Sequence, residues 1–225
     1  MTVLHEFLEH DVEGYLFHDL RAMQGVTAPP DAPGGGLGYP LLITTLAGIE
    51  LLGAILSRRP FNTNSGRQYF ADYWHRFLYP SNQPPPPEID VVYQLARHGI
   101  AHNFLLKGPL GVVKGQPSHH LKHVGGRFLI DATQLANDLM FSYETRVKPH
   151  VSAPNADVDP VQMTDRLTEI ASAYQGQAHP LIQPIMGPAM AATGPLPPGS
   201  GPSGPTGPIS SDVSSSGLPK PPMAP

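Results

Sequence analysis

Residues 40–56 read Pro-Leu-Leu-Ile-Thr-Thr-Leu-Ala-Gly-Ile-Glu-Leu-Leu-Gly-Ala-Ile-Leu, the most apolar run of the chain. A helix that crosses a membrane needs about 20 apolar residues, and this run is shorter. It also holds Glu50 near its middle, where a carboxylate is costly in lipid. Pro40 suits a first helical turn, and Arg58 and Arg59 suit the negative end of a helix dipole. The run therefore predicts a helix buried on most sides inside a bundle, with no membrane span.

Glu50 is the one charged residue of this run. The positions three or four residues away hold the small residues Ala47, Gly53 and Ala54, so another backbone or a long side chain could approach the carboxylate. The alternative is a glutamate exposed to solvent on a thin polar face of the helix. The sequence leaves both interpretations open.

Helical spacing of apolar residues recurs along the rest of the chain, over 3–23, 64–79, 88–106, 131–148 and 159–174. The aromatic residues of 64–79 are expected in the core and not on a surface that stacks bases. Between the fourth and fifth helices, short apolar pieces are broken by Gly and Pro. We therefore expect an all-α fold, a bundle of about five helices with a small irregular or β-hairpin insert near 109–130.

Proline and glycine divide the chain into regions. From Gly176 onward roughly two residues in five are Pro or Gly, and only Asp212 and Lys220 are charged. Such a segment buries too little apolar surface to offset its ordering entropy. We expect a helical bundle over 1–148, a linker with an ancillary helix over 149–175, and a disordered tail over 176–225.

Charge and cysteine content exclude several classes of function. The formal net charge is −4, so a large nonspecific nucleic-acid surface is not expected and any anion site must be local. The chain has no cysteine, which excludes disulfides, thiolate metal sites and a cysteine nucleophile. The acidic N-terminal residues do not resemble a signal peptide. A cytoplasmic protein is expected.

The stretch Arg97-His98-Gly99-Ile100-Ala101-His102-Asn103 carries the chemistry most suited to catalysis. Arg97 keeps its positive charge at physiological pH, whereas His98 and His102 exchange a proton near neutrality. An arginine that grips an anion beside a group that moves protons suits the chemistry of phosphate esters.

This stretch, on a helical layout over 1–148, resembles the HEPN family (higher eukaryotes and prokaryotes nucleotide-binding). Ribonuclease members carry an Arg, then four to six intervening residues of which the first is usually polar, as His98 is, and then a His. The resemblance implies metal-independent RNA cleavage by attack of a 2′-hydroxyl, which leaves a cyclic phosphate and a 5′-hydroxyl. It also implies that Arg97 holds the phosphate, that His102 is general base or acid, and that His98 positions them.

The resemblance further implies a homodimer in which both motifs line one cleft, with an antitoxin partner where the enzyme acts in a toxin–antitoxin or phage-defence system. No cofactor or metal is expected. We assign supporting roles to Asn103 and to Glu50, which is a candidate for orienting Arg97 or His102.

Helix geometry sets a condition on this site. Arg97 and His102 are five residues apart, which places them about 140° apart around a regular α-helix. Convergence needs a long arginine, a partner chain, or a distortion near Gly99, whose presence inside a helix costs about 1 kcal/mol relative to alanine. The alternative is that Arg97 pairs with Glu50 or Asp90 and the histidines only pack, as in a non-catalytic dimerising interaction module.

Two further groups of residues have side chains suited to binding. Four basic residues follow the motif and could form an RNA groove: Lys107, Lys114, Lys122 and Arg127. Three histidines follow as His119-His120-x-x-His123 and would have metal-ligand spacing on a helix. Nearby Gly and Pro disfavour a helix, so we interpret them as solvated loop histidines.

Overall fold

A computed structural model describes residues 2–29, 31, 36–80, 88–97 and 110–186. The chain divides into two compact units, residues 1–180 and 181–225. The sheet, the candidate site and the cavity described below belong to the first unit, and the last helix begins in it.

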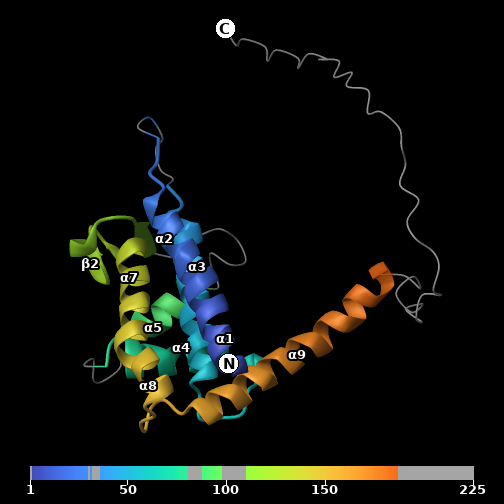
Figure 1. Ribbon diagram of the computed structural model, residues 1–225. Coiled ribbons are helices and arrows are strands. Elements are labelled where there is room, and N and C mark those ends of the chain that lie inside the picture. The colour runs from blue at the N-terminus through green and yellow to red at the C-terminus, as the bar shows by residue number, and fades with distance from the viewer. Residues whose placement is uncertain (1, 30, 32–35, 81–87, 98–109, 187–225) are drawn as a thin grey trace, which may run out of the picture. The chain divides into compact units, whose positions relative to one another are not determined.

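The described residues are mostly helical and include one small sheet (Figure 1). The α-helices are α1 (Val3–Phe7), α2 (His18–Gly25), α3 (Gly38–Ile55), α4 (Gly66–Tyr73), α5 (Glu88–Val91), α7 (Ala132–Ser142), α8 (Lys148–Ser152) and α9 (Pro160–Met186). Wider π-helical segments are η1 (Leu8–Phe17), η3 (Trp74–Leu78), η4 (Val92–Arg97) and η6 (Tyr143–Val147). Two short 3₁₀ turns are η2 (Thr63–Ser65) and η5 (Pro117–His119). The prediction of a mainly helical protein is confirmed.

Helix α3 is the centre of the fold. Ten of its 18 residues are buried, and α2, α4 and α7 pack against it. By length and composition alone α3 could cross a membrane, although about half of it is buried inside the protein. The buried helix predicted over residues 40–56 is therefore present as α3, at Gly38–Ile55.

Gly53 sets how closely α4 packs on α3. A Cβ atom at Gly53 would stand 2.0 Å from the backbone oxygen of Tyr69 and 2.6 Å from its carbonyl carbon. Only a residue without a side chain leaves room for that backbone. The aromatic side of α4 and η3 then enters the core, where Phe70, Tyr73 and Trp74 are fully buried. The prediction that these aromatic residues form core is confirmed.

The insert is a three-stranded sheet in the order β1-β3-β2. Its strands are β1 (Leu110–Val113), β2 (Lys122–Val124) and β3 (Arg127–Asp131). β2 and β3 form an antiparallel pair, whereas β1 pairs with β3 in parallel. The predicted hairpin is thus present as β2 and β3, but the expectation of an all-α fold with only an irregular or hairpin insert is corrected by the parallel third strand.

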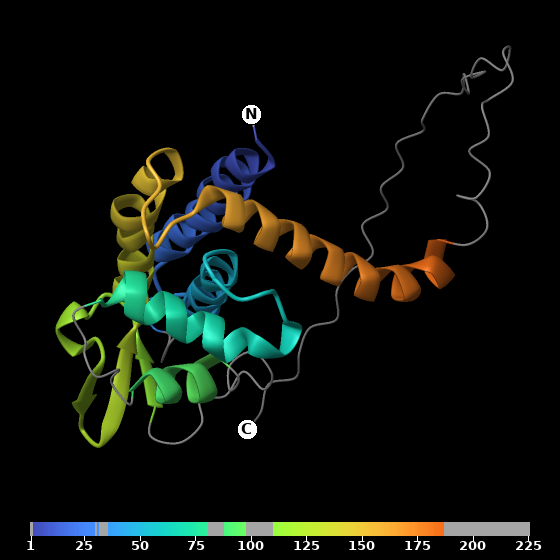
Figure 2. The same cartoon turned by 90° about the horizontal axis from the view of Figure 1, so that it is seen from below.

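The sheet is joined to the helices at the start of α7 (Figure 2). Asp131 ends β3 and caps α7, where its Oδ1 accepts the backbone N–H of Gln134 at 2.8 Å. Lys114, just after β1, donates to the carbonyls of Met23, Val26 and Gly36. These bonds tie the residue after β1 to the end of α2 and to the residues just before α3.

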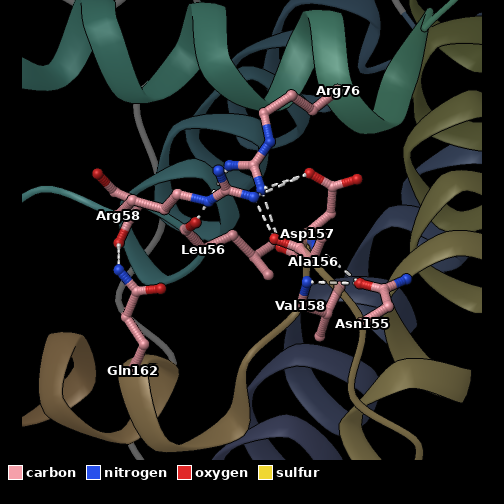
Figure 3. A network of polar contacts seen from close by, with 9 residues as sticks. Leu56, Arg58, Arg76, Asn155, Ala156, Asp157, Val158 and Gln162 are labelled. Carbon is pink, nitrogen blue, oxygen red and sulfur yellow. Dashed lines mark hydrogen bonds and ion pairs between the residues drawn. The ribbon is translucent and has the colours of Figure 1, made fainter.

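Two arginines hold the loop between α8 and α9 (Figure 3). Arg76 donates to the backbone oxygens of Leu56 and Asp157 at 3.3 and 2.9 Å and to the Asp157 carboxylate at 3.1 Å. Arg58 donates to the backbone oxygen of Ala156. The loop is thereby fixed against the C-terminal end of α3, and α9 begins from that fixed point. α9 then continues to Met186, past the predicted start of the tail at residue 176.

Candidate functional site

The described residues reach the predicted catalytic motif at its first member. Arg97 is the last residue of η4, and the structure describes its backbone. His98, His102 and Asn103 lie outside the described residues. The part of the site that the structure describes is therefore Glu50 together with the helix that leads into the motif.

Glu50 projects from α3 toward the start of α4 and toward the motif helix. A Cβ atom at Gly66 would stand 2.4 Å from Glu50 Oε1 and 2.8 Å from the hydroxyl oxygen of Tyr93. Both oxygens therefore lie against the same glycine, and a larger residue there would displace them. Of the two interpretations of Glu50, the structure supports the half-buried carboxylate that a neighbouring helix approaches.

Three helices define the surroundings of this carboxylate. Gly66 is the first residue of α4, so the carboxylate lies near the positive end of that helix dipole. Tyr93 belongs to η4 and is 8% exposed, with its ring centroid 5.2 Å from that of Phe70. Glu50 therefore lies beside the helix that carries the motif, at Tyr93, which precedes Arg97 by four residues.

The motif helix ends in a π-helical segment. η4 (Val92–Arg97) has the form in which N–H groups bond to the carbonyl five residues earlier. The same form occurs in η1, η3 and η6, so it does not single out the motif helix. The turn that leads to Arg97 is therefore not a regular α-helical one, and His102 lies outside the described residues.

A cavity of about 280 Å³ opens beside Glu50. Its walls come from α3, from residues 61–69 and from α9. Glu50 and Gly66 line it, so the cavity and the contact with Tyr93 share two residues. The candidate site therefore consists of a carboxylate, a phenol on the motif helix and an adjoining hollow.

One alternative partner for Arg97 is engaged elsewhere. The carboxylate of Asp90 accepts from Arg67 Nε of α4 at 2.9 Å, and it accepts from the terminal nitrogen of the same guanidinium. Glu50 is the other carboxylate suggested for Arg97. It reaches from α3 to the start of α4, where the Tyr93 hydroxyl of the motif helix also lies.

Two of the four basic residues after the motif have partners within the described part of the chain. Lys114 donates to the carbonyls of Met23, Val26 and Gly36. Lys122 donates to the carbonyl of Ser118 at 2.8 Å. Lys107 lies outside the described residues. Lys114 and Lys122 therefore have structural partners, and this weakens the expectation of a basic RNA groove here.

The three histidines do not come together. His119 contacts Gln116, and His123 lies on β2 with its ring centroid 5.2 Å from that of Phe128. No group of three metal-ligating side chains occurs among the described residues. The interpretation as solvated loop histidines is wrong for His120, whose side chain is only 9% exposed.

His120 belongs to a polar network that sequence spacing did not indicate. Its Nδ1 accepts the backbone N–H of Asp131 at 3.2 Å, so the neutral ring carries its proton on Nε2. Nε2 lies 3.1 Å from the Tyr79 hydroxyl, which donates to Asp138 at 2.5 Å. Burial lowers the pKa of His120, and burial together with Asp138 raises the pKa of Tyr79 above its ordinary value.

This network connects the end of η3, the sheet and α7. Gln134 also donates to Asp138, at 2.7 Å, so the carboxylate is bonded from two sides. The Nδ1 lone pair of His120 already accepts from Asp131, and the phenol of Tyr79 stays protonated, so neither group offers a free base or nucleophile. The network therefore holds the insert against the helices.

Comparison with protein-family models, with curated proteins and with solved structures finds no match. The geometry around Glu50 is thus the main support for a function.

Proposed function

We propose that the protein is a HEPN-like, metal-independent endoribonuclease of the toxin–antitoxin or phage-defence kind. The supporting observation is the meeting of Glu50 and Tyr93 over Gly66, which brings a carboxylate beside the motif helix. The helical segments 3–25, 38–55, 66–78, 88–97 and 132–147 would be the helices of a HEPN-like bundle. The protein would act in the cytoplasm, where its RNA substrates are.

Each residue then has a role set by its chemistry. Arg97 binds the scissile phosphate and stabilises the charge that develops on it in the transition state. His102 transfers a proton as general base or acid, a role worth about 10² to 10⁴ in rate. Glu50 orients Arg97 or His102, while His98 and Asn103 hold the other groups in place.

The reaction forms a bond between the 2′-oxygen and phosphorus and breaks the bond between phosphorus and the 5′-oxygen. One proton leaves the 2′-hydroxyl and one is delivered to the 5′-oxygen. Two proton-transfer groups are required, and a homodimer with both motifs in one cleft supplies a His102 from each chain. An antitoxin partner would act by covering that cleft.

The test is cleavage of defined RNAs in EDTA by wild type and by the variants Arg97→Ala and His102→Ala. We expect products that end in a cyclic phosphate, and their loss in both variants without loss of helical circular dichroism. His119→Ala is the matched control, because the hydrogen bond of the His119 ring with Gln116 is exposed. Cleavage that survives His102→Ala would contradict the assignment.

The same experiment separates the enzyme from a non-catalytic module. Sedimentation of the wild type reports whether it dimerises, independently of any cleavage. A wild type that dimerises but cleaves none of the RNAs would support the dimerising interaction module instead.

A further inference from the structure

The cavity beside Glu50 has two aromatic walls. The Phe61 ring lies nearly parallel to that of Tyr69, with centroids 5.8 Å apart and planes 12° apart. The ring of Tyr174 on α9 lies 6.3 Å from that of Phe61 at an angle of 48°. All three residues line the cavity. Aromatic rings arranged in this way offer flat faces on which another planar group can stack.

The aromatic walls are held in place by hydrogen bonds. The hydroxyl of buried Tyr69 accepts from the backbone N–H of Asn62 at 2.7 Å and donates to the carbonyl of Pro60 at 3.3 Å. The backbone N–H of Phe61 donates to Glu169 of α9 at 2.7 Å. These bonds join residues 60–62 to α4 on one side and to α9 on the other. The cavity is therefore built from fixed elements and does not depend on a ligand to form.

Besides the Glu50 carboxylate, the lining contains neutral polar groups. Asn62 Oδ1 accepts the backbone N–H of Asn64 at 2.9 Å, so the hydrogens of its amide nitrogen are the groups it offers to a ligand. The Thr63 hydroxyl can both donate and accept. A planar group with mixed donors and acceptors at its edge can bond to this amide and hydroxyl while its face stacks on the rings.

The cavity adjoins the helix that leads into the motif. Glu50 and Gly66 line the cavity, and the hydroxyl of Tyr93, four residues before Arg97 in the sequence, lies against the same Gly66. The volume of about 280 Å³ lies near the lower end of ligand sites, which hold about 300–1,000 Å³.

We propose that this cavity is a nucleobase pocket for the nucleotide next to the scissile phosphate, an inference that rests on the proposed ribonuclease function. Tyr174 supplies the exposed stacking face, and Asn62 and Thr63 contact the edge of the base. Because stacking tolerates any base, Tyr174 sets affinity, whereas the polar edge sets preference among bases.

Binding is measured with a fluorescent RNA hexanucleotide in which every 2′-hydroxyl is methylated, so that it cannot be cleaved. Tyr174→Ala is expected to weaken binding about 5- to 150-fold, the range that stacking of one base supports. Tyr174→Phe keeps the ring face and is expected to bind as the wild type does. Tyr15→Ala is the control, because Tyr15 is exposed to nearly the same extent (59% against 57%) and does not line the cavity.

A second set of hexanucleotides, each with one abasic position, identifies the base that enters the pocket. One abasic position should weaken binding to the wild type and have no effect on Tyr174→Ala, because both changes remove the same stack. If the abasic change and Tyr174→Ala weaken binding independently at every position, the pocket is overturned, even if the protein cleaves RNA. If the two changes are coupled in a protein that cleaves no RNA, the pocket stands and the ribonuclease assignment fails.

Two other ligands are tested directly. Mononucleotides that bind as tightly as the hexanucleotide would show a pocket for free nucleotides and overturn the RNA form of the inference. If Tyr174→Ala abolishes binding of lysine amide but does not change RNA binding, the cavity is an amine site and the inference of a nucleobase pocket is overturned.

Discussion

Replacing Gly53 by alanine is expected to destabilise the protein strongly, although alanine is the better helix former. A Cβ atom at this position would stand 2.0 Å from the backbone oxygen of Tyr69, whereas real Cβ contacts are essentially never shorter than 3 Å. The obstacle is backbone in α4, so it cannot be removed by rotating a side chain. The two helices would have to separate by about 1 Å at their crossing.

The expected magnitude follows from two opposing effects. Overpacking a core costs about 1–3 kcal/mol and occasionally more. Alanine in place of glycine inside a helix returns about 1 kcal/mol. Because the separation would also loosen the buried rings of Phe70 and Trp74, the packing cost belongs at the upper end. We expect a net loss of about 2 kcal/mol in the free energy of unfolding, a large share of the 5–15 kcal/mol typical of a domain.

The assay is urea unfolding followed by the fluorescence of Trp74, the single tryptophan of the chain and a fully buried one. Gly176→Ala is the matched control. Gly176 lies inside α9, and a Cβ there would meet nothing within 4 Å. The control change is therefore expected to be neutral or stabilising by up to about 1 kcal/mol.

An unfolding midpoint for Gly53→Ala equal to that of the wild type or above it would refute this reasoning. It would mean that α4 does not pack on α3 through direct contact of the backbone with Gly53. A loss as large in Gly176→Ala would show that the effect comes from the glycine change itself and not from the crossing.

Three further outcomes follow from the same structure. Gly66→Ala should displace the candidate carboxylate and lower RNA cleavage at least tenfold, measured with an unfolding midpoint near that of the wild type, because the atoms displaced are the ends of side chains. Burial lowers the pKa of His120, so the unfolded chain binds its proton more readily; stability is full above about pH 6.5 and falls below it by at most about 1.4 kcal/mol per pH unit. His120→Gln should flatten that slope in urea titrations, while His75, whose pKa is also lowered by burial, keeps part of it. Arg76→Met should cost about 1–2 kcal/mol in the same assay, because its side chain is 24% exposed and bonds two backbone oxygens, whereas Arg58→Met, 61% exposed, should change little.

The helices were predictable because a continuous apolar pattern depends on neighbours in the sequence. The run at 40–56 corresponds to α3 at Gly38–Ile55. Asp131 caps α7 by accepting from the backbone N–H of Gln134, and a cap of this kind also depends only on the residues that follow it. Helix spacing, however, does not distinguish an α-helical turn from the π-helical turns of η4, because the apolar stripe tolerates both.

The errors concern partners that are distant in the sequence. Tyr79 and Asp138 are 59 residues apart, and only the folded chain brings them onto His120. Local Gly and Pro residues correctly excluded a helix there, but they carry no information about burial. The parallel pairing of β1 with β3 was missed for the same reason, since a parallel register is set by a crossover and not by a tight turn.

The crossing of α3 with α4 at Gly53 and the candidate site at Glu50 lie on neighbouring turns of α3. Gly53 admits the backbone of α4, and three residues earlier Glu50 reaches Gly66 at the start of that same helix. The close approach of the two helices requires a glycine only at position 53. Gly66 instead leaves space for the side-chain oxygens of Glu50 and Tyr93, and the packing of apolar side chains would not require that space. The pair Gly53→Ala and Gly66→Ala therefore separates the two roles. The first should lower stability, and the second should lower activity in a protein that remains folded.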